Sequence, residues 1–278
     1  MGKKKPNQMS FLEHLEALRK HLIRSILYII ILAFTAFFFK HFIFNEVLLA
    51  PKTPDFITNK TMCSLGEFLG LKSICINQTP FSIINIKMTG QFMTHITVSL
   101  IVGLVIAFPF VFNEFWLFLK PALKKREIKH SRGAVFFASV LFSLGALFGY
   151  YIIVPLSMNF LGTYNVSQDV VNKINLNSYI QTFTSVVLAS AVVFELPILI
   201  FFLSKIGLVT PKFLKKYRKH SLVAILALSA IITPPDIFSQ ILVSLPLVLL
   251  YEVGIGISKR VEKRNNKKLL SDELATTD

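Results

Sequence analysis

Acidic residues are scarce in this chain, and cysteine is almost absent. Its 278 residues contain 15 Asp and Glu against 30 Lys and Arg, and only two are cysteine. Two cysteines match no zinc-site pattern, and the six histidines do not have metal-ligand spacing. The HExxH and GxSxG motifs and the glycine-rich P-loop are absent as well. We therefore expect no enzyme, no metal site, no cofactor and no ATP-driven transport by this chain alone.

Two other features are missing. No inverted repeat is visible in the apolar runs, which argues against an ordinary secondary transporter. Residues 1–5 are basic, but no small-residue cleavage site follows an apolar segment, so we expect no cleavable signal peptide.

Apolar sequence is what the chain has in abundance. Hydrophobic residues make up 53% of it, and 27 residues are phenylalanine. The net charge of +15 could suggest nucleic-acid binding, but the basic residues bracket the apolar runs, which is typical of a membrane protein. We therefore predict an all-α, polytopic membrane protein with no nucleic-acid partner.

Six apolar runs are candidates for bilayer-spanning helices, which need about 20 residues. We place them at 22–39, 91–113, 133–156, 179–203, 221–233 and 237–251. The last two are short, so either they thin the bilayer locally or their helices extend beyond it. Residues 10–22 are amphipathic and predict an interfacial helix that leads into the first span. Residues 1–258 then form one membrane domain with an extracytoplasmic loop at 40–90, followed by a charged, disordered tail at 259–278.

The basic residues predict the orientation of the spans. The N-terminal region, the second-to-third loop, the fourth-to-fifth loop and the tail together carry 24 of the 30 Lys and Arg. The positive-inside rule therefore places both termini in the cytoplasm. Cys63 and Cys75 then face outward, either as free thiols or as a disulfide. We predict the disulfide, because that compartment is oxidising.

One carboxylate lies inside an apolar run. Glu195 is the only charged residue in 179–203 and lies about 12 Å from one end, at 1.5 Å per residue. At that depth a carboxylate is costly unless it has a partner, a water-filled cavity or a bound proton. Pro197 removes a backbone donor nearby, so we also expect a broken helix. Glu195 is either a site within the membrane or a protonated residue that holds two helices together.

Several motifs resemble the TatC family of twin-arginine protein translocases. They are His14-Leu-Glu-Ala-Leu-Arg19, Ala50-Pro51, Phe108-Pro109, Trp116-Leu-Phe-Leu-Lys-Pro-Ala-Leu-Lys-Lys-Arg-Glu127, Phe194-Glu-Leu-Pro197 and Thr233-Pro-Pro-Asp-Ile-Phe-Ser-Gln240. Together they cover about residues 10–258. The resemblance implies a concave six-helix fold in the bacterial cytoplasmic (inner) membrane. It also implies that twin-arginine signal peptides of folded proteins bind at the cytoplasmic face and that the proton-motive force drives export.

The resemblance further implies roles for individual residues and partners. Signal-peptide contacts are expected from Glu127, Glu16, Phe118, Arg19 and Pro121. An intramembrane polar site for a partner helix is expected from Glu195, Gln240, Thr233 and Pro109. Pro51 and Asp236 are expected on the extracytoplasmic side. The implied partners are single-span TatA-type subunits, twin-arginine signal peptides, lipid and further copies of the chain, with a separate TatB-type subunit left open.

One position departs from the family pattern. The family motif His-Leu-x-Glu-Leu-Arg has a Glu that contributes to signal recognition, and here that position is Ala17. Either the adjacent Glu16 substitutes for it or Glu127 carries more of the recognition, while Glu16 also fits a plain i,i+4 ion pair with Lys20. The alternative function is a proton-coupled small-molecule transporter with Glu195 as its proton site.

Overall fold

A computed structural model describes residues 11–70, 75–78, 81–120, 133–167, 169, 172–233 and 237–274, with backbone alone at 11, 237–239 and 265–274. The described residues are almost entirely helical, as predicted. They belong to two compact units, and each is described by itself. Unit 1 comprises Met1–Leu48, Ile84–Val140 and Asn175–Ile180, and unit 2 comprises Leu49–Ile83, Leu141–Ile174 and Gln181–Asp278.

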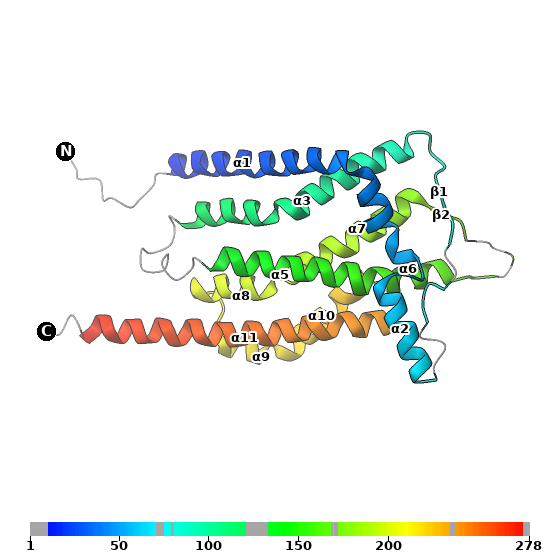
Figure 1. Cartoon of the computed structure of the whole chain (residues 1–278). Coiled ribbons are helices and arrows are strands. Elements are labelled where there is room, and N and C mark those ends of the chain that lie inside the picture. The colour runs from blue at the N-terminus through cyan, green and yellow to red at the C-terminus, as the bar shows by residue number, and fades with distance from the viewer. Residues whose placement is uncertain are drawn as a thin grey trace. The chain divides into compact units, whose positions relative to one another are not determined.

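Unit 1 is built on two long helices, α1 (Phe11–Phe38) and α3 (Gly90–Leu119), which lie side by side (Figure 1). A short π-helix, η1 (Phe42–Leu48), follows α1. The two long helices approach closely at Gly103, where an added Cβ would lie 2.5 Å from the backbone nitrogen of Ala33. A small residue is therefore needed at this crossing, as is common between membrane helices. Pro109 lies inside α3 without ending it.

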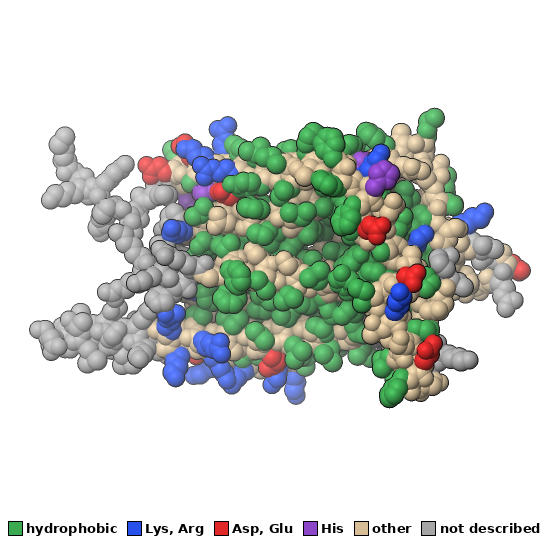
Figure 2. Space-filling view, in the orientation of Figure 1, with side chains coloured by type: hydrophobic (Ala, Val, Ile, Leu, Met, Phe, Trp, Pro, Cys, Tyr) green, Lys and Arg blue, Asp and Glu red, His purple; other side chains and the backbone are tan. Residues whose placement is uncertain are grey.

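The outer surface of α1 is apolar along most of its length. Figure 2 shows hydrophobic side chains over this helix and charged or histidine side chains toward its ends. Large side chains such as Ile30 and Phe34 are more than half exposed. An apolar surface of this extent is expected to face lipid.

Unit 2 holds most of the remaining helices. Its first elements are η2 (Ala50–Lys52) and α2 (Ile57–Phe68). A nearly continuous helical run follows, made of α5 (Ala134–Phe148), which begins in unit 1, then η5 (Gly149–Ile153) and α6 (Val154–Thr163). Two-residue strands β1 (Ile83–Ile84) and β2 (Ile174–Asn175) pair with each other.

The second half of unit 2 runs from α7 to the C-terminal helix. Its elements are α7 (Leu176–Val193), which begins in unit 1, α8 (Leu196–Lys205), α9 (Pro211–Lys216), α10 (Arg218–Ile232) and α11 (Ile237–Leu274). Helix α11 packs along α8 and α10. Gly145 and Gly149 let α5 and η5 approach α7, because an added Cβ would lie 2.8 Å from the Cα of Ala191 and 2.9 Å from the Oγ of Ser190.

All six predicted spans fall on helices. Five helical runs are long and apolar enough to cross a membrane: Leu12–Phe38, Gly90–Leu119, Ala134–Thr163, Leu176–Lys205 and Gln240–Arg264. Helix α10 has 15 residues, in agreement with the short fifth span predicted from the sequence.

Three expectations about the ends of the chain differ from the structure. Helix α1 is one unbroken helix of 28 residues, so no helix boundary separates the amphipathic residues 11–22 from the first span. The sixth apolar run does not end its helix at Tyr251, because α11 continues through 38 residues. The charged segment from Lys259, expected to be disordered, is part of α11 as far as Leu274.

Candidate functional site

The N-terminal part of α1 and the C-terminal part of α3 bring a buried carboxylate against two basic side chains. Glu114 on α3 has a side chain only 6% exposed, and its Oε2 lies 2.5 Å from Nδ1 of His21. Nη1 of Arg24 lies 4.0 Å from the same oxygen. A buried carboxylate needs such partners, because its desolvation is costly. The three side chains form what we call the Glu114 cluster.

Aromatic rings adjoin the Glu114 cluster. Phe118 stacks on His14 with ring centroids 4.5 Å apart and meets His21 edge-on at 6.3 Å. His14, Ala17 and His21 follow at spacings of three and four, so they share the face of α1 that packs on α3. Ala17 lies between the two histidines on this face.

Of the predicted signal-binding residues that the structure describes, only Phe118 adjoins the Glu114 cluster. Glu16 and Arg19 are exposed. Glu16 forms the i,i+4 ion pair with Lys20 at 2.8 Å, with both side chains 65% exposed. Glu127 and Pro121 lie outside the described residues.

Glu114 and His21 were not singled out from the sequence. The predicted second span ends at Asn113, which places Glu114 at the start of a loop. In the structure Glu114 lies inside α3, near its C-terminal end. The sequence did contain a signal for this packed face, because His14, Ala17 and His21 recur at helical spacing and therefore lie on one side of the helix.

Glu195 stands at a break between two helices of unit 2. Helix α7 ends at Val193 and α8 begins at Leu196, with Glu195 as the residue that precedes α8. Pro197 occupies one of the first positions of α8, where its missing N–H does least harm. The predicted broken helix is therefore present.

The carboxylate of Glu195 is not satisfied by the described residues. Both oxygens are buried, and neither has a hydrogen-bond partner of standard geometry within the described part of the chain. The backbone of Phe142 on α5 is the polar group beside it. Two buried oxygens without partners are costly for a charged group. They favour a proton, water or a partner's side chain at this position.

The other predicted intramembrane residues have local partners. Gln240 donates from Nε2 to the carbonyl of Leu226 at 3.2 Å and so joins α11 to α10. Thr233 is buried and donates to the carbonyl of Ser229 at 2.8 Å. Gln240 therefore contacts the middle of α10, and Thr233 contacts its last turn. Pro109 belongs to unit 1.

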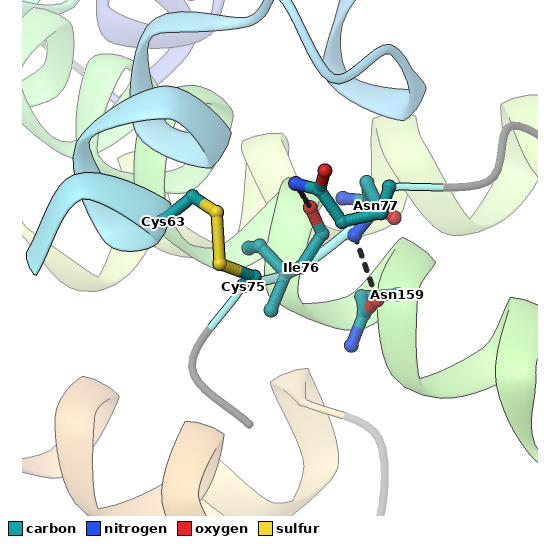
Figure 3. Close-up of a disulfide and its surroundings, with 6 residues drawn as sticks. Cys63, Cys75, Ile76, Asn77 and Asn159 are labelled. Atoms are coloured by element: carbon teal, nitrogen blue, oxygen red, sulfur yellow. Dashed lines mark hydrogen bonds between the residues drawn. A yellow bond between two sulfur atoms is a disulfide. The ribbon is translucent and has the colours of Figure 1, made fainter. Parts of the chain in front are cut away.

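The two cysteines form the predicted disulfide. Cys63 on α2 and Cys75 are bonded with an S–S distance of 1.99 Å (Figure 3). The bond fixes the segment that leads into Asn77, two residues later. Figure 3 shows the backbone N–H of Asn77 donating to Oδ1 of Asn159 on α6, at 2.9 Å.

Asn77 and Asn59 build a buried polar network beside this disulfide. Asn77 has a positive φ of 53°, and its Nδ2 donates to the carbonyl of Pro155 at 3.0 Å. Asn59 donates from its own Nδ2 to the carbonyl of Pro51 at 3.0 Å. Pro51, expected on the extracytoplasmic side, is therefore a buried part of this network. Asp236 lies outside the described residues.

The geometry defines an almost entirely helical, multi-pass membrane protein with one carboxylate held between two helices and a second at a break within a span. In the described part of the chain, no group of three or more His, Cys, Asp or Glu is arranged to hold a metal ion. The sequence profile of the family described as Sec-independent protein translocase protein (TatC) matches residues 13–246. The chain therefore belongs to the TatC family.

Individual relatives match over nearly their whole length. A Sec-independent protein translocase protein TatC of Blattabacterium sp. subsp. Periplaneta americana is 40% identical over 264 residues, covering 94% of this chain and 99% of the relative. TatCy of Bacillus subtilis is 30% identical over 272 residues, covering 98% and 97%. A crystal structure described as the twin arginine translocase receptor TatC matches with a TM-score of 0.65 at 32% identity, covering 90% and 99%.

Proposed function

We propose that this chain is the signal-binding subunit of a twin-arginine protein translocase in the bacterial cytoplasmic membrane. The single observation that supports this most directly is membership of the TatC family over residues 13–246. A solved relative is described as the translocase receptor, and the chain covers 99% of it. Folded proteins with twin-arginine signal peptides are then the cargo, and the proton-motive force drives their export.

The chemistry of the inner end of unit 1 fits a signal with two arginines. Arginine presents a planar fork of donors that matches a carboxylate with two parallel hydrogen bonds. Glu16 is exposed on α1, and Glu127 follows α3 in the sequence. The stacked rings of Phe118 and His14 lie at the same end of α1 and α3, and guanidinium groups also stack on such rings.

Glu195 supports a second contact, with a transmembrane helix of a TatA-type partner. Its carboxylate oxygens are buried and have no hydrogen-bond partner of standard geometry in the described part of the chain, so an incoming polar side chain would satisfy them. Gln240 and Thr233 bond to backbone carbonyls of α10 and would shape the adjoining surface.

Peptide binding tests the proposal. The purified full chain in lipid nanodiscs should bind a synthetic twin-arginine signal peptide about tenfold or more tightly than the same peptide with two lysines, a difference of one decade per 1.4 kcal/mol. Equal affinity for the two peptides would contradict signal recognition. Solute uptake into liposomes by the chain alone would instead favour the proton-coupled transporter.

A further inference from the structure

We propose that Arg24 occupies the position beside Glu114 that an arginine of the signal peptide takes, so that Arg24 competes with the signal for this carboxylate. The inference rests on the proposed function, because it names a further carboxylate of the same binding surface. It gives the chain a third acid, in addition to Glu16 and Glu127, and assigns Arg24 a restraining role.

The two basic neighbours of Glu114 are held differently. His21 touches Oε2 at 2.5 Å and is 21% exposed, so it is a firm partner within the helix pair. Arg24 approaches the same oxygen only to 4.0 Å and is 60% exposed. A separation of 4.0 Å exceeds the range of about 2.7–3.2 Å for a direct N–H···O hydrogen bond. Arg24 is therefore a loosely held guanidinium that can leave.

The carboxylate keeps capacity for another guanidinium. An ionised carboxylate has about four lone-pair sites, and among the described residues a hydrogen bond from His21 occupies one of them. Arg24 is the more exposed of the two basic partners, so a ligand that displaces it would reach Glu114 from the side that Arg24 flanks. Because Glu114 is mostly buried, an ion pair at this position is less screened than one at the open surface.

The position of Ala17 is a further reason to assign Glu114 a role in binding the signal peptide. Where the family pattern has Glu, this chain has Ala on the face of α1 that carries His14 and His21. Glu16 lies on a different face and is already paired with Lys20. Glu114 puts a carboxylate against the face that contains Ala17, but on the opposite helix. The negative charge is therefore retained at this end of the helix pair.

A purely structural role for Arg24 makes the opposite prediction. If Arg24 only strengthens the packing of α1 on α3, Arg24→Gln should weaken or leave unchanged the binding of a signal peptide. If Arg24 competes with the signal, Arg24→Gln should tighten binding. The sign of the change therefore separates the two roles.

The experiment measures peptide affinity by fluorescence anisotropy on the full chain in nanodiscs. Arg24→Gln should bind the twin-arginine peptide about two- to fivefold more tightly, the factor that corresponds to an exposed ion pair. Lys120→Gln is the matched control, because it removes one positive charge from an exposed residue at the end of α3. It should change the affinity less than Arg24→Gln does, since it does not lie in the Glu114 cluster.

Glu114→Gln completes the test. It should weaken binding of the twin-arginine peptide, and in the double variant Arg24→Gln should no longer tighten binding. A gain that persists in the double variant would overturn the proposal. If Glu114→Gln does not fold, Arg24→Gln against Lys120→Gln decides alone. If the wild-type chain prefers the twin-arginine peptide but Arg24→Gln binds that peptide equally or more weakly, only this inference is overturned. If the wild-type chain does not prefer the twin-arginine peptide, the proposed function is overturned.

Discussion

At the scale of single residues, the two buried carboxylates differ in how readily they could be predicted from the sequence. Glu195 was predicted because a lone carboxylate in an apolar run is costly without a partner, a water-filled cavity or a bound proton. Glu114 was missed because it lies one residue beyond the predicted span, where an acidic residue is typical of a solvent-exposed loop. Only the packing of α3 on α1 turns it into a buried residue. Periodicity identifies faces of helices, but it does not say which face meets which.

Glu127 gives the first prediction. It lies outside the described residues, so the expectation comes from the TatC motif that ends at Glu127. Glu127→Gln should weaken binding of a twin-arginine peptide by about tenfold or more, because a charge-assisted hydrogen-bonded pair contributes about 1.5–3 kcal/mol. The already weak binding of a twin-lysine peptide should hardly change. Equal affinities of folded wild type and variant for the twin-arginine peptide would shift the assignment to Glu16 and Glu114.

Glu195 gives the second prediction. Glu195→Ala should impair export or assembly with the TatA-type partner while signal binding stays close to wild type. Glu195→Gln should be milder, because it keeps hydrogen bonding without the charge. Export in cells and co-purification of the partner are the measurements. Normal export by Glu195→Leu would show that the carboxylate has at most a structural role.

At the scale of elements, the break between α7 and α8 and the disulfide were both predictable. Pro197 two residues after a charged residue predicts an interrupted helix, and two cysteines in one outward loop have only each other to pair with. The network of Asn59, Asn77 and Asn159 was not predictable. Its partners are distant in sequence, and the sequence does not show which backbone carbonyls will be buried.

Asn77 gives the third prediction, about stability. Asn77→Ala should lower the free energy of unfolding by about 2–3 kcal/mol. The variant loses the side-chain hydrogen bonds of Asn77, and alanine adopts the positive φ of 53° less readily than asparagine. Asn77→Gly should be less harmful, since glycine adopts positive φ freely. Thermal unfolding in detergent, with the disulfide kept intact, measures both. A larger loss for glycine than for alanine would contradict the role assigned to the backbone conformation.

At the scale of the whole molecule, the order of spans was the most reliable prediction. The apolar runs decide it, and their positions do not depend on detailed packing. The ends of the helices were less predictable, because helix propensity carries α1 and α11 through charged sequence that hydropathy assigns to the interface or to a tail.

Topology gives the fourth prediction. A membrane-impermeant maleimide added to sealed cells should label Lys87→Cys in the outward loop and should not label Lys215→Cys on α9. Both lysines are exposed. The two native cysteines are bonded to each other and should give little background under non-reducing conditions. Labelling of Lys215→Cys before the cells are opened would contradict cytoplasmic placement of that loop.

The length of α11 has a practical consequence for imaging. Its 38 residues extend ten positions past Arg264, the end of its apolar span, to Leu274. At 1.5 Å per residue, those positions carry the helix about 15 Å farther. A small rigid domain joined in helical register near Leu274 would follow the orientation of α11 instead of tumbling on a flexible linker. Such a fusion would give electron cryo-microscopy a fiducial outside the detergent belt, which a chain of 31.4 kDa otherwise lacks.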